Sequence, residues 1–368
     1  MKNNIIELYD IYEPTLLPLL RLKPLFALRT GIFSEAERVL LKLKSEQTKD
    51  TDLLDIKNEL KIHISRDENF YKDYLHIHYA SLETTSENYI SKNYINIKAK
   101  TSNIQPTQPA ELIANIGKNI QNDVAFLSRE EFPIIENPEF GLEGDLTDLW
   151  IASSAKVSPH AVIDTRNGPV IIDANVKISA FSLIRGPVYI GPDSNIDRVF
   201  IENSITGKHA RLGGEISNSI IGDFSNKHHE GFLGHSLVGD WVNLGALTTT
   251  SDLKNNYGKI RLQFEQTNFD TKTIKFGSII GDHVKTAIGT MLNTGTIIDF
   301  GSLIFTTVKN EVYYPHRKYY SPFSWGSDVQ RYKFDRFTED MKIIMARRNE
   351  KPDKRILALI QQFFGETN

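Results

Sequence analysis

The sequence predicts three parts: a small α/β domain over residues 1–148, a parallel β-helix over 149–328 and a helical segment over 329–368. Short apolar runs mixed with a helical pattern predict the first part. From about Trp150 onward, aliphatic residues recur every six positions, which is typical of a parallel β-helix. Apolar residues at helical spacing near the end predict the third part.

The first part begins with residues 3–11, which predict a short strand, and 32–44, which predict a helix with Ser34 as its N-cap. The polar stretch 45–73 is rich in Lys, Asp and Glu, which predicts an exposed helix. Further short apolar runs follow, and this alternation of segments favours an α/β domain. These runs lie at 94–99, 111–117 and 123–127.

The loop 15–32 holds three basic residues that could bind the phosphates of a nucleotide: Arg21, Lys23 and Arg29. Phosphate cradles usually need a glycine-rich turn between a strand and a helix, and the sequence contains neither G-x-G-x-x-G nor a P-loop here. Two interpretations stay open, a nucleotide-binding loop and an irregular buried connection whose basic ends face solvent.

The six-residue period is the main evidence for the β-helix. Small or turn residues lie beside the aliphatic positions, as in IIGDFS and IIGDHV, so each short strand turns one side chain inward and a corner follows. Three such hexads make one coil, and successive coils lie about 4.8 Å apart. The expected inward residues are Ile151, Val157, Ile163, Ile172, Ile178, Ile184, Ile190, Ile196, Phe232, Val238, Leu244, Ile274, Ile280, Thr286, Leu292, Ile298 and Ile304.

The period breaks near 198–231 and again near 249–272, on both sides of the histidine-rich stretch 225–258. Insertions that break a solenoid period project from one edge and often bind ligands. We therefore expect 225–258 to lie at a loop-bearing edge of the β-helix.

The C-terminal segment carries Phe337, Met341, Ile344 and Met345 on one helical face, and a second apolar helix follows Pro352. We expect these helices to cap the open end of the solenoid or to dock on the first domain. A helix that lies on a membrane surface is the alternative.

Composition excludes several classes of protein and site. The chain has 368 residues, a formal net charge of −3 and no basic block, so a nucleic-acid partner is not expected. No apolar run is long enough to span a bilayer, and the first residues lack a signal peptide, which predicts a cytoplasmic protein without a membrane partner. The absence of cysteine excludes disulfides, thiol nucleophiles and Cys-ligated zinc.

Several motifs together resemble one family. They are LLPL, KP and LRTGI near the start, then RNGPVII (166–172), IRGPVYIGP (184–192), GGEISNSI (213–220), SNKHHEGFLGHS (225–236), WVNLGA (241–246), NNYG (255–258), IIGDHVKT (279–286), LNTGT (292–296) and SPFSWG (321–326). The chain resembles the sugar nucleotidyltransferases with a left-handed β-helix, relatives of the bifunctional bacterial enzyme that acetylates glucosamine 1-phosphate and then attaches a uridyl group. The resemblance implies a degenerate nucleotidyltransferase-like α/β domain, a left-handed β-helix that forms a homotrimer, and an acyl-CoA such as acetyl-CoA bound between neighbouring coils.

The resemblance also implies roles for residues of the stretch 225–258. His229, three residues before Phe232, takes the place of the catalytic base. The residues at substrate-binding positions are Lys227, Asn243, Asn256, Tyr257 and Lys275. His283 and Lys285, next to Asp282, form a further polar cluster that we assign to substrate binding.

The implied chemistry is acyl transfer from coenzyme A to a sugar phosphate or nucleotide sugar. A neutral imidazole, whose pKa is ordinarily near 6.5, takes the proton that an attacking amine loses. Three positions depart from the family: Phe232 replaces a tyrosine, His235 an aspartate and Leu247 a glycine. Mg²⁺ is expected only if the chain transfers nucleotidyl groups.

Three alternatives remain open. The chain could be a sugar-1-phosphate nucleotidyltransferase, or a non-catalytic β-helix that senses sugar nucleotides or serves as a structural partner. His228, His229 and His235 could be inert corner residues of the solenoid. They could also bind zinc, but nothing in their spacing requires a metal, and we predict none.

Overall fold

The computed structural model describes residues 5–9, 14–23, 28–35, 37–38, 59–63, 107–306, 315, 317–326 and 330–367. The chain divides into two compact units, and each is described by itself. Unit 1 comprises Met1–Glu13, Lys23–Arg29 and Phe33–Thr107, and unit 2 comprises Pro14–Leu22, Thr30–Ile32 and Gln108–Asn368. The domain boundaries expected from the sequence remain predictions.

Unit 1 contains a two-stranded parallel sheet of β1 (Ile5–Tyr9) and β2 (Glu59–His63). The strand predicted within 3–11 is therefore confirmed. The helix predicted across 45–73 is wrong for Glu59–His63, where Leu60 and Ile62 alternate with polar residues and so follow the period of a strand. The apolar run at 94–99 lies outside the described residues.

Ser34 caps a helix start in unit 1, as predicted. The backbone N–H of Ser34 donates to Glu37 Oε2 at 2.7 Å, and the N–H of Glu37 donates to Ser34 Oγ at 3.3 Å. These reciprocal bonds form a capping box.

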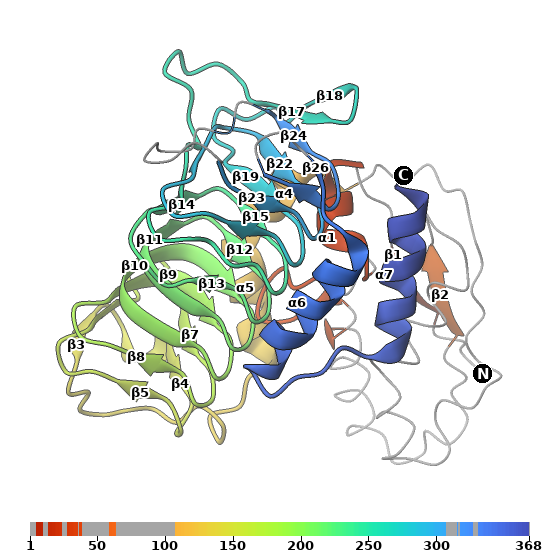
Figure 1. Cartoon of the computed structure of the whole chain (residues 1–368). Helices are drawn as coiled ribbons and strands as arrows, with labels where there is room; N and C mark the ends of the chain where they lie inside the picture. The colour runs from red at the N-terminus through yellow and green to blue at the C-terminus, as the bar shows by residue number, and fades with distance from the viewer. Residues whose placement is uncertain are drawn as a thin grey trace. The chain divides into compact units, whose positions relative to one another are not determined.

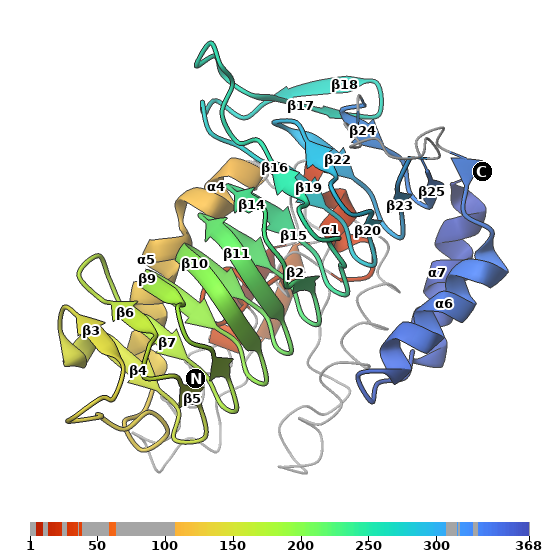
Figure 2. The ribbon, with the colours of Figure 1, turned by 60° about the vertical axis from the view of Figure 1, so that its left-hand side comes forward.

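Unit 2 is a parallel β-helix whose strands form three faces, which we call A, B and C in chain order (Figures 1 and 2). Face A contains β3 (Gly141–Glu143), β6 (Val162–Asp164), the first half of β9 (Leu183–Ile190), the middle of β10 (Asn195–Thr206), the end of β11 (Arg211–Ser217), β14 (Phe232–Gly234), β16 (Thr249–Thr250) and β21 (Met291–Leu292). The predicted parallel β-helix is confirmed, and its left-handed sense remains a prediction.

Faces B and C complete each coil. Face B contains β4 (Leu149–Ile151), β7 (Val170–Ile172), the ends of β9 and β10, β12 (Ile220–Ile221), β15 (Leu237–Val238), β19 (Ser278–Ile280), β22 (Thr296–Ile298) and β24 (Tyr319–Tyr320). Face C contains β5 (Lys156–Val157), β8 (Lys177–Ile178), the starts of β10 and β11, β13 (Asn226–Lys227), β20 (Lys285–Thr286), β23 (Leu303–Ile304) and β25 (Ser324–Trp325). β26 (Gln330–Arg331) pairs antiparallel with β25.

A stack of inward aliphatic side chains forms the core of the β-helix. On face A, Ile163, Ile184, Ile201 and Ile216 follow one another in register and are fully buried. Burial of a side chain of this size contributes roughly 1.5–3 kcal/mol. The expected inward residues lie in this core, with two exceptions, Phe232 and Ile274.

The two exceptions have a common physical cause, a change in coil length. Register pairs Phe232 with the outward Glu215, so that Leu233 takes the inward position above Ile216. Ile274 is 46% exposed because it lies in an insertion, before the coils resume at Ser278.

The corner between faces A and B is shortened by one residue in three successive coils. Inward residues are six apart from Ile184 to Ile190 but five apart from Leu233 to Val238, and likewise from 201 to 206 and from 216 to 221. Each short corner holds one residue in the left-handed region: Asn203 (φ 37°), Asn218 (φ 49°) and His235 (φ 44°). Asn and His tolerate this conformation better than most residues.

The break in the period near 198–231 is therefore confirmed and comes from shortened corners, while this stretch continues the coils as strands β10 to β13 and does not project. The second predicted break is confirmed as an insertion. Residues 251–277 leave the coil between β16 and β19 and carry an antiparallel hairpin of β17 (Arg261–Phe264) and β18 (Thr267–Asp270), which projects from the β-helix (Figure 2).

The corner between faces B and C is a structural stack. The side chains of Asp223, Asp240 and Asp282 each accept a backbone N–H from the preceding coil. Rings at the next position also stack: His209 on Phe224 (4.8 Å between centroids), Phe224 on Trp241 (4.1 Å) and Trp241 on His283 (6.3 Å). The repeated Gly-Asp-aromatic motif therefore stabilises coil stacking.

Helices cover parts of the β-helix. α5 (Ile116–Asp123) follows α4 (Pro109–Ala114) and contacts β9 and β10, while α1 (Leu17–Leu20) contacts β19. Short 3-10 turns occupy Pro14–Leu16, Val124–Phe126 and Leu146–Asp148.

Two C-terminal helices, α6 (Phe334–Ala346) and α7 (Lys354–Glu366), confirm the predicted helical segment. Phe337 and Met341 of α6 and Ile360 of α7 are buried against Phe300 and Phe323 of the last coils. The helices thus pack against the side of the last coils (Figure 1). Within the described part of the chain, none of the helices combines the length and the apolar character that crossing a membrane requires.

We expect Ile201→Ala to lower the free energy of unfolding by about 2–5 kcal/mol, because it leaves a cavity in a fully buried ladder. The same exchange at Ile274, which is 46% exposed, should change it by less than about 0.5 kcal/mol. Urea denaturation of both variants measures the difference. Equal losses would contradict the assigned register.

Candidate functional site

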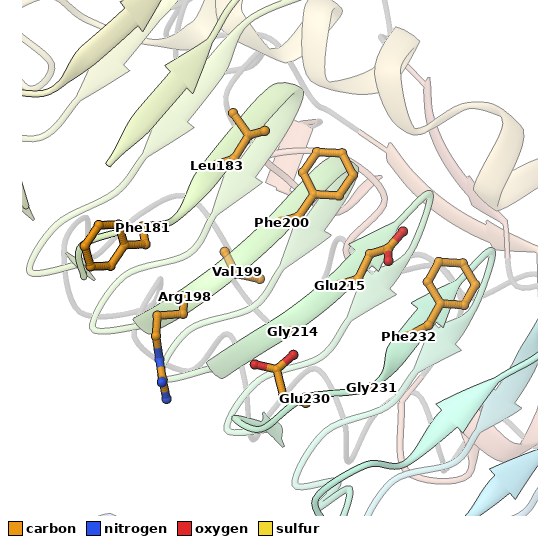
Figure 3. A pocket seen from close by; sticks show the side chains of 10 residues that line it. All are labelled: Phe181, Leu183, Arg198, Val199, Phe200, Gly214, Glu215, Glu230, Gly231 and Phe232. Atoms are coloured by element: carbon orange, nitrogen blue, oxygen red, sulfur yellow. The ribbon is translucent and has the colours of Figure 1, made fainter. Parts of the chain in front are cut away.

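An open groove of about 540 Å³ lies on face A beside the corner between faces C and A (Figure 3). Successive outward residues of neighbouring strands form one wall: Leu183, Phe200, Glu215 and Phe232. The other side consists of corner residues. These are Phe181, Arg198, Val199, Gly214, Glu230 and Gly231.

Two glycines form the floor of the groove. Gly214 (φ 73°) and Gly231 (φ 127°) adopt conformations that side-chain-bearing residues rarely accept. A Cβ atom on Gly214 would lie 2.8 Å from Lys227 Nζ and 2.9 Å from the carbonyl oxygen of Gly231. A Cβ atom on Gly231 would lie too close to the carbonyl oxygen of Thr248, so side chains at these two corners would collide with neighbouring residues.

The groove combines apolar rings with charge. Phe181 is 77% exposed, and together with Phe200 and Phe232 it offers aromatic surface to a ligand. The carboxylate of Glu215 lies between the rings of Phe200 and Phe232, and Arg198 and Glu230 lie on the other side of the groove (Figure 3). Such a mixed surface suits a ligand with an apolar chain and a polar or cationic group.

His229 lies at the corner between β13 and β14, directly before the groove residue Glu230. Its side chain is exposed, and its ring meets the edge of His228 at a centroid distance of 5.2 Å. Its imidazole makes no hydrogen bond to the described part of the chain. The predicted base thus stands at the rim of the groove without a group that orients it.

Lys227 occupies an interior position. Register places it between Leu212 and Leu244 in the inward column of face C, and it is 3% exposed. Its ammonium donates to the carbonyl oxygens of Gly213 (2.8 Å) and His229 (2.9 Å). Burial lowers the pKa of Lys227 from 10.5 to about 8, although Glu230 and Glu215 act in the opposite direction.

Lys227 therefore holds the corner that carries His229. Its ammonium does not reach the surface of the groove, so a direct contact with substrate stays a prediction.

His235 and Asp252 form a pair that sequence reasoning missed. His235 Nδ1 lies 2.6 Å from Asp252 Oδ2, and the side chains are 16% and 14% exposed. The hydrogen bond from His235 lowers the pKa of Asp252, and the positive charge of the nearby Lys275 acts in the same direction. The structure thus brings the predicted Lys275 together with a histidine and a carboxylate.

One signal in the sequence could have revealed this pair. His235 and Asp252 are 17 residues apart, which equals the step from Ile216 to Leu233, one coil below. Residues one coil apart lie directly above each other, so knowledge of the local coil length predicts the contact.

The other predicted binding residues lie elsewhere. Asn243 is on face C, where its Oδ1 accepts a hydrogen bond from Asn226 Nδ2 at 2.6 Å. Asn256 and Tyr257 belong to the insertion, where Asn256 Oδ1 accepts the N–H of Gly258 and Tyr257 is 69% exposed.

His283 and Lys285 contribute to packing against the C-terminal segment. His283 is 8% exposed, and its ring meets the edge of Phe337 of α6. Lys285 Nζ lies 6.0 Å from the ring centroid of Tyr332, and burial lowers the pKa of this lysine. The two residues lie apart from the groove lining.

The three basic residues of the proposed nucleotide loop divide between the units. Arg21, in unit 2, forms a bidentate pair with Asp299 (3.2 and 2.6 Å) and lies over the ring of Phe363. Lys23 and Arg29 belong to unit 1, where Arg29 lies 3.7 Å from Glu37. The guanidinium of Arg21 thus makes a structural contact with Asp299. Among the described residues, no group of three or more His, Asp or Glu side chains is placed to hold a metal ion.

Comparison with known proteins shows similarity to the bifunctional GlmU proteins. The chain is 28% identical over 173 residues to the bifunctional protein GlmU of Cyanothece sp., a match that covers 44% of this chain and 35% of the relative. It is 32% identical over 118 residues to GlmU of Methanococcus vannielii, covering 32% of this chain and 27% of the relative. The chain thus spans about a third of the length of these curated relatives, and the resemblance predicted from the motifs is confirmed over that part.

No protein-family model matches the chain. Among solved structures, the UDP-N-acetylglucosamine acyltransferase of Francisella novicida aligns with 14% identity and a TM-score of 0.21, covering 43% of this chain and 57% of that chain. A TM-score this low carries no argument about the present chain.

Replacement of Lys227 by leucine should remove a pH dependence of stability. Between about pH 8 and 10.5 the unfolded chain keeps the proton of Lys227 whereas the folded chain releases it, so the free energy of unfolding rises with pH in this window. The shift corresponds to about 3 kcal/mol. Denaturation of the wild type between pH 7 and 10.5 should show this rise, and the Lys227→Leu variant should lack it.

Lys156→Leu, an exposed lysine on the same face, is the matched control and should retain the rise. A rise that persists in Lys227→Leu would show that the buried ammonium is not its source.

Proposed function

We propose that unit 2 is an acyltransferase that moves an acyl group, most simply acetyl, from coenzyme A to an amine or hydroxyl group of a sugar phosphate or nucleotide sugar. The observation that carries the proposal is a groove with aromatic walls and a glycine floor, adjoined by imidazole side chains. The similarity to GlmU proteins supports it, because the resembled family acetylates an amino-sugar phosphate. The left-handed coil and the homotrimer belong to the same proposal.

The groove suits the pantetheine arm of an acyl-CoA. This arm is a long, largely apolar chain, and Phe200 and Phe232 offer flat apolar surface along the groove. Glu215 and Glu230 disfavour the phosphates of the coenzyme within the groove, so these groups would lie outside it. The same carboxylates favour an acceptor that carries an amine.

The reaction itself is a proton-coupled acyl transfer. The acceptor nitrogen or oxygen attacks the thioester carbonyl, its proton passes to an imidazole, the C–S bond breaks and the coenzyme A thiolate takes a proton. The sequence-based proposal gives the role of base to His229, at the rim of the groove. Backbone N–H groups at the glycine corners are candidates to stabilise the oxyanion.

Nucleotidyl transfer with Mg²⁺ gains no support from the described residues. Its strongest candidate, the guanidinium of Arg21, is committed to Asp299. A non-catalytic sensor would differ from an acyltransferase because it would bind its ligand without transferring the acyl group.

Acetyl-CoA should raise the melting temperature of the protein, since a ligand that binds only the folded state stabilises it by mass action. Phe200→Ala should weaken this binding about tenfold, equivalent to roughly 1.4 kcal/mol for one lost aromatic contact. Isothermal titration calorimetry measures the affinity, and a thiol-release assay with glucosamine 1-phosphate measures turnover.

Phe269→Ala, on the projecting hairpin, is the matched control and should bind like the wild type. If UTP with Mg²⁺ stabilises the protein and acetyl-CoA does not, the nucleotidyl alternative replaces this proposal. Binding of acetyl-CoA without turnover of any acceptor would favour a sensor.

A further inference from the structure

Backbone hydrogen bonds hold both residues of the His235–Asp252 pair in place. The N–H of His235 donates to the carbonyl of Ser217 in the coil below, and its own carbonyl accepts the N–H of Gly277. The carbonyl of Asp252 accepts the N–H of Phe276, and Leu253 bridges Lys275 across the neck of the insertion. The two side chains therefore meet at a point where the insertion leaves and rejoins the coils, and its position is fixed by hydrogen bonds.

The pair has the orientation that general-base catalysis requires. An Asp carboxylate at 2.6 Å from Nδ1 holds the proton of the neutral ring on Nδ1, which leaves the lone pair on Nε2. Nε2 makes no hydrogen bond to the described residues. It is also not among the buried side-chain atoms of the described residues that lack a hydrogen bond. Nε2 is therefore open to solvent.

The pair adjoins the groove through Phe232. A Cβ atom on Gly234 would collide with the ring of Phe232 and would lie 2.7 Å from Asp252 Oδ2. The ring of Phe232 and the carboxylate of Asp252 thus both lie next to Gly234. A ligand that passes the ring of Phe232 comes next to the imidazole of His235.

Few charged groups face the pair. Lys275, from the insertion, is close enough to Asp252 to act on its charge. In the coil below, the corresponding corner position holds the uncharged Asn218, which pairs with Asn203. Asp252 is therefore the anionic neighbour that orients the imidazole of His235.

We propose that His235, positioned by Asp252, is the base of the acyl transfer, in place of His229; this inference rests on the proposed function. Nε2 of His235 accepts the proton of the acceptor amine or hydroxyl as the new bond to the thioester carbon forms. The C–S bond breaks, and the coenzyme A thiolate takes up a proton as the imidazolium returns to its neutral form. Asp252 keeps the imidazole oriented throughout and does not itself change protonation.

His229 differs from His235 in each of these respects. Its ring is exposed, and its imidazole has no hydrogen-bond partner in the described part of the chain. The backbone carbonyl of His229, and not its ring, accepts the hydrogen bond from the ammonium of Lys227. It lies at the opposite side of β14 from His235, at the other end of the same strand.

The test compares His235→Asn, Asp252→Asn and His229→Asn in the thiol-release assay. Asparagine is accommodated at position 235, because it occupies the same corner position in the two preceding coils. We expect His235→Asn to lower kcat by about 10²–10⁴-fold with acetyl-CoA affinity unchanged, and to lower it more than His229→Asn does. His209→Asn, at the corner between faces B and C and 3.8 Å from Asp193, is the matched control and should match the wild type.

Asp252→Asn tests positioning. It should lower kcat and move the acidic limb of the pH–rate profile to lower pH, since a carboxylate no longer stabilises the imidazolium; a purely structural role would leave the limb in place. Circular dichroism melts of all variants check folding. Activity that survives in His235→Asn but is lost in His229→Asn would overturn the inference, as would an unmoved limb. An inactive wild type that binds no acetyl-CoA would instead refute the proposed function, before any variant is compared.

Discussion

The hydrogen-bonded stacking of coils is the constraint on which the rest of unit 2 depends. Parallel pairing places equivalent residues at one height per coil, about 4.8 Å apart, so a position is interior or exterior by its register and not by its residue type. Lys227 illustrates this. It lies between Leu212 and Leu244 in the inward column, and its ammonium donates hydrogen bonds to the carbonyl oxygens of a nearby corner. A lysine in this position is tolerated because two carbonyl oxygens accept hydrogen bonds from its ammonium and burial lowers its pKa.

The three corners of the coil serve different purposes. Between faces B and C, carboxylates and rings repeat so regularly that the corner stabilises the stack and leaves little room for a ligand. Between faces C and A, glycines at 214 and 231 form the floor of the groove, and between A and B the coil is tightened by one residue. The candidate site lies on face A, between the two corners that depart from regular geometry.

Sequence periodicity predicted the β-helix, most of its interior and the C-terminal helices, because one inward residue every six positions follows from coil geometry and apolar residues at helical spacing mark a packed helix. It failed at Phe232, where a corner loses one residue, and at Ile274, which an insertion moves outside the coil. A corner that is shorter by one residue cannot be recognised from the residue types around it. The His235–Asp252 contact was hidden for the same reason, since its spacing of 17 has meaning only once the local coil length is known. His229, in contrast, could be named from its motif.

The left-handed corner occupied by Asn203, Asn218 and His235 gives the solenoid a property that a compact globular fold lacks. The same backbone conformation recurs in three successive coils, so an exchange of asparagine for histidine at one of these corners moves an imidazole along the axis by about 4.8 Å per coil without a change in the backbone. A catalytic side chain on such a scaffold can therefore change its position only by whole coils. A site can migrate along the coils while the groove beside it stays where it is.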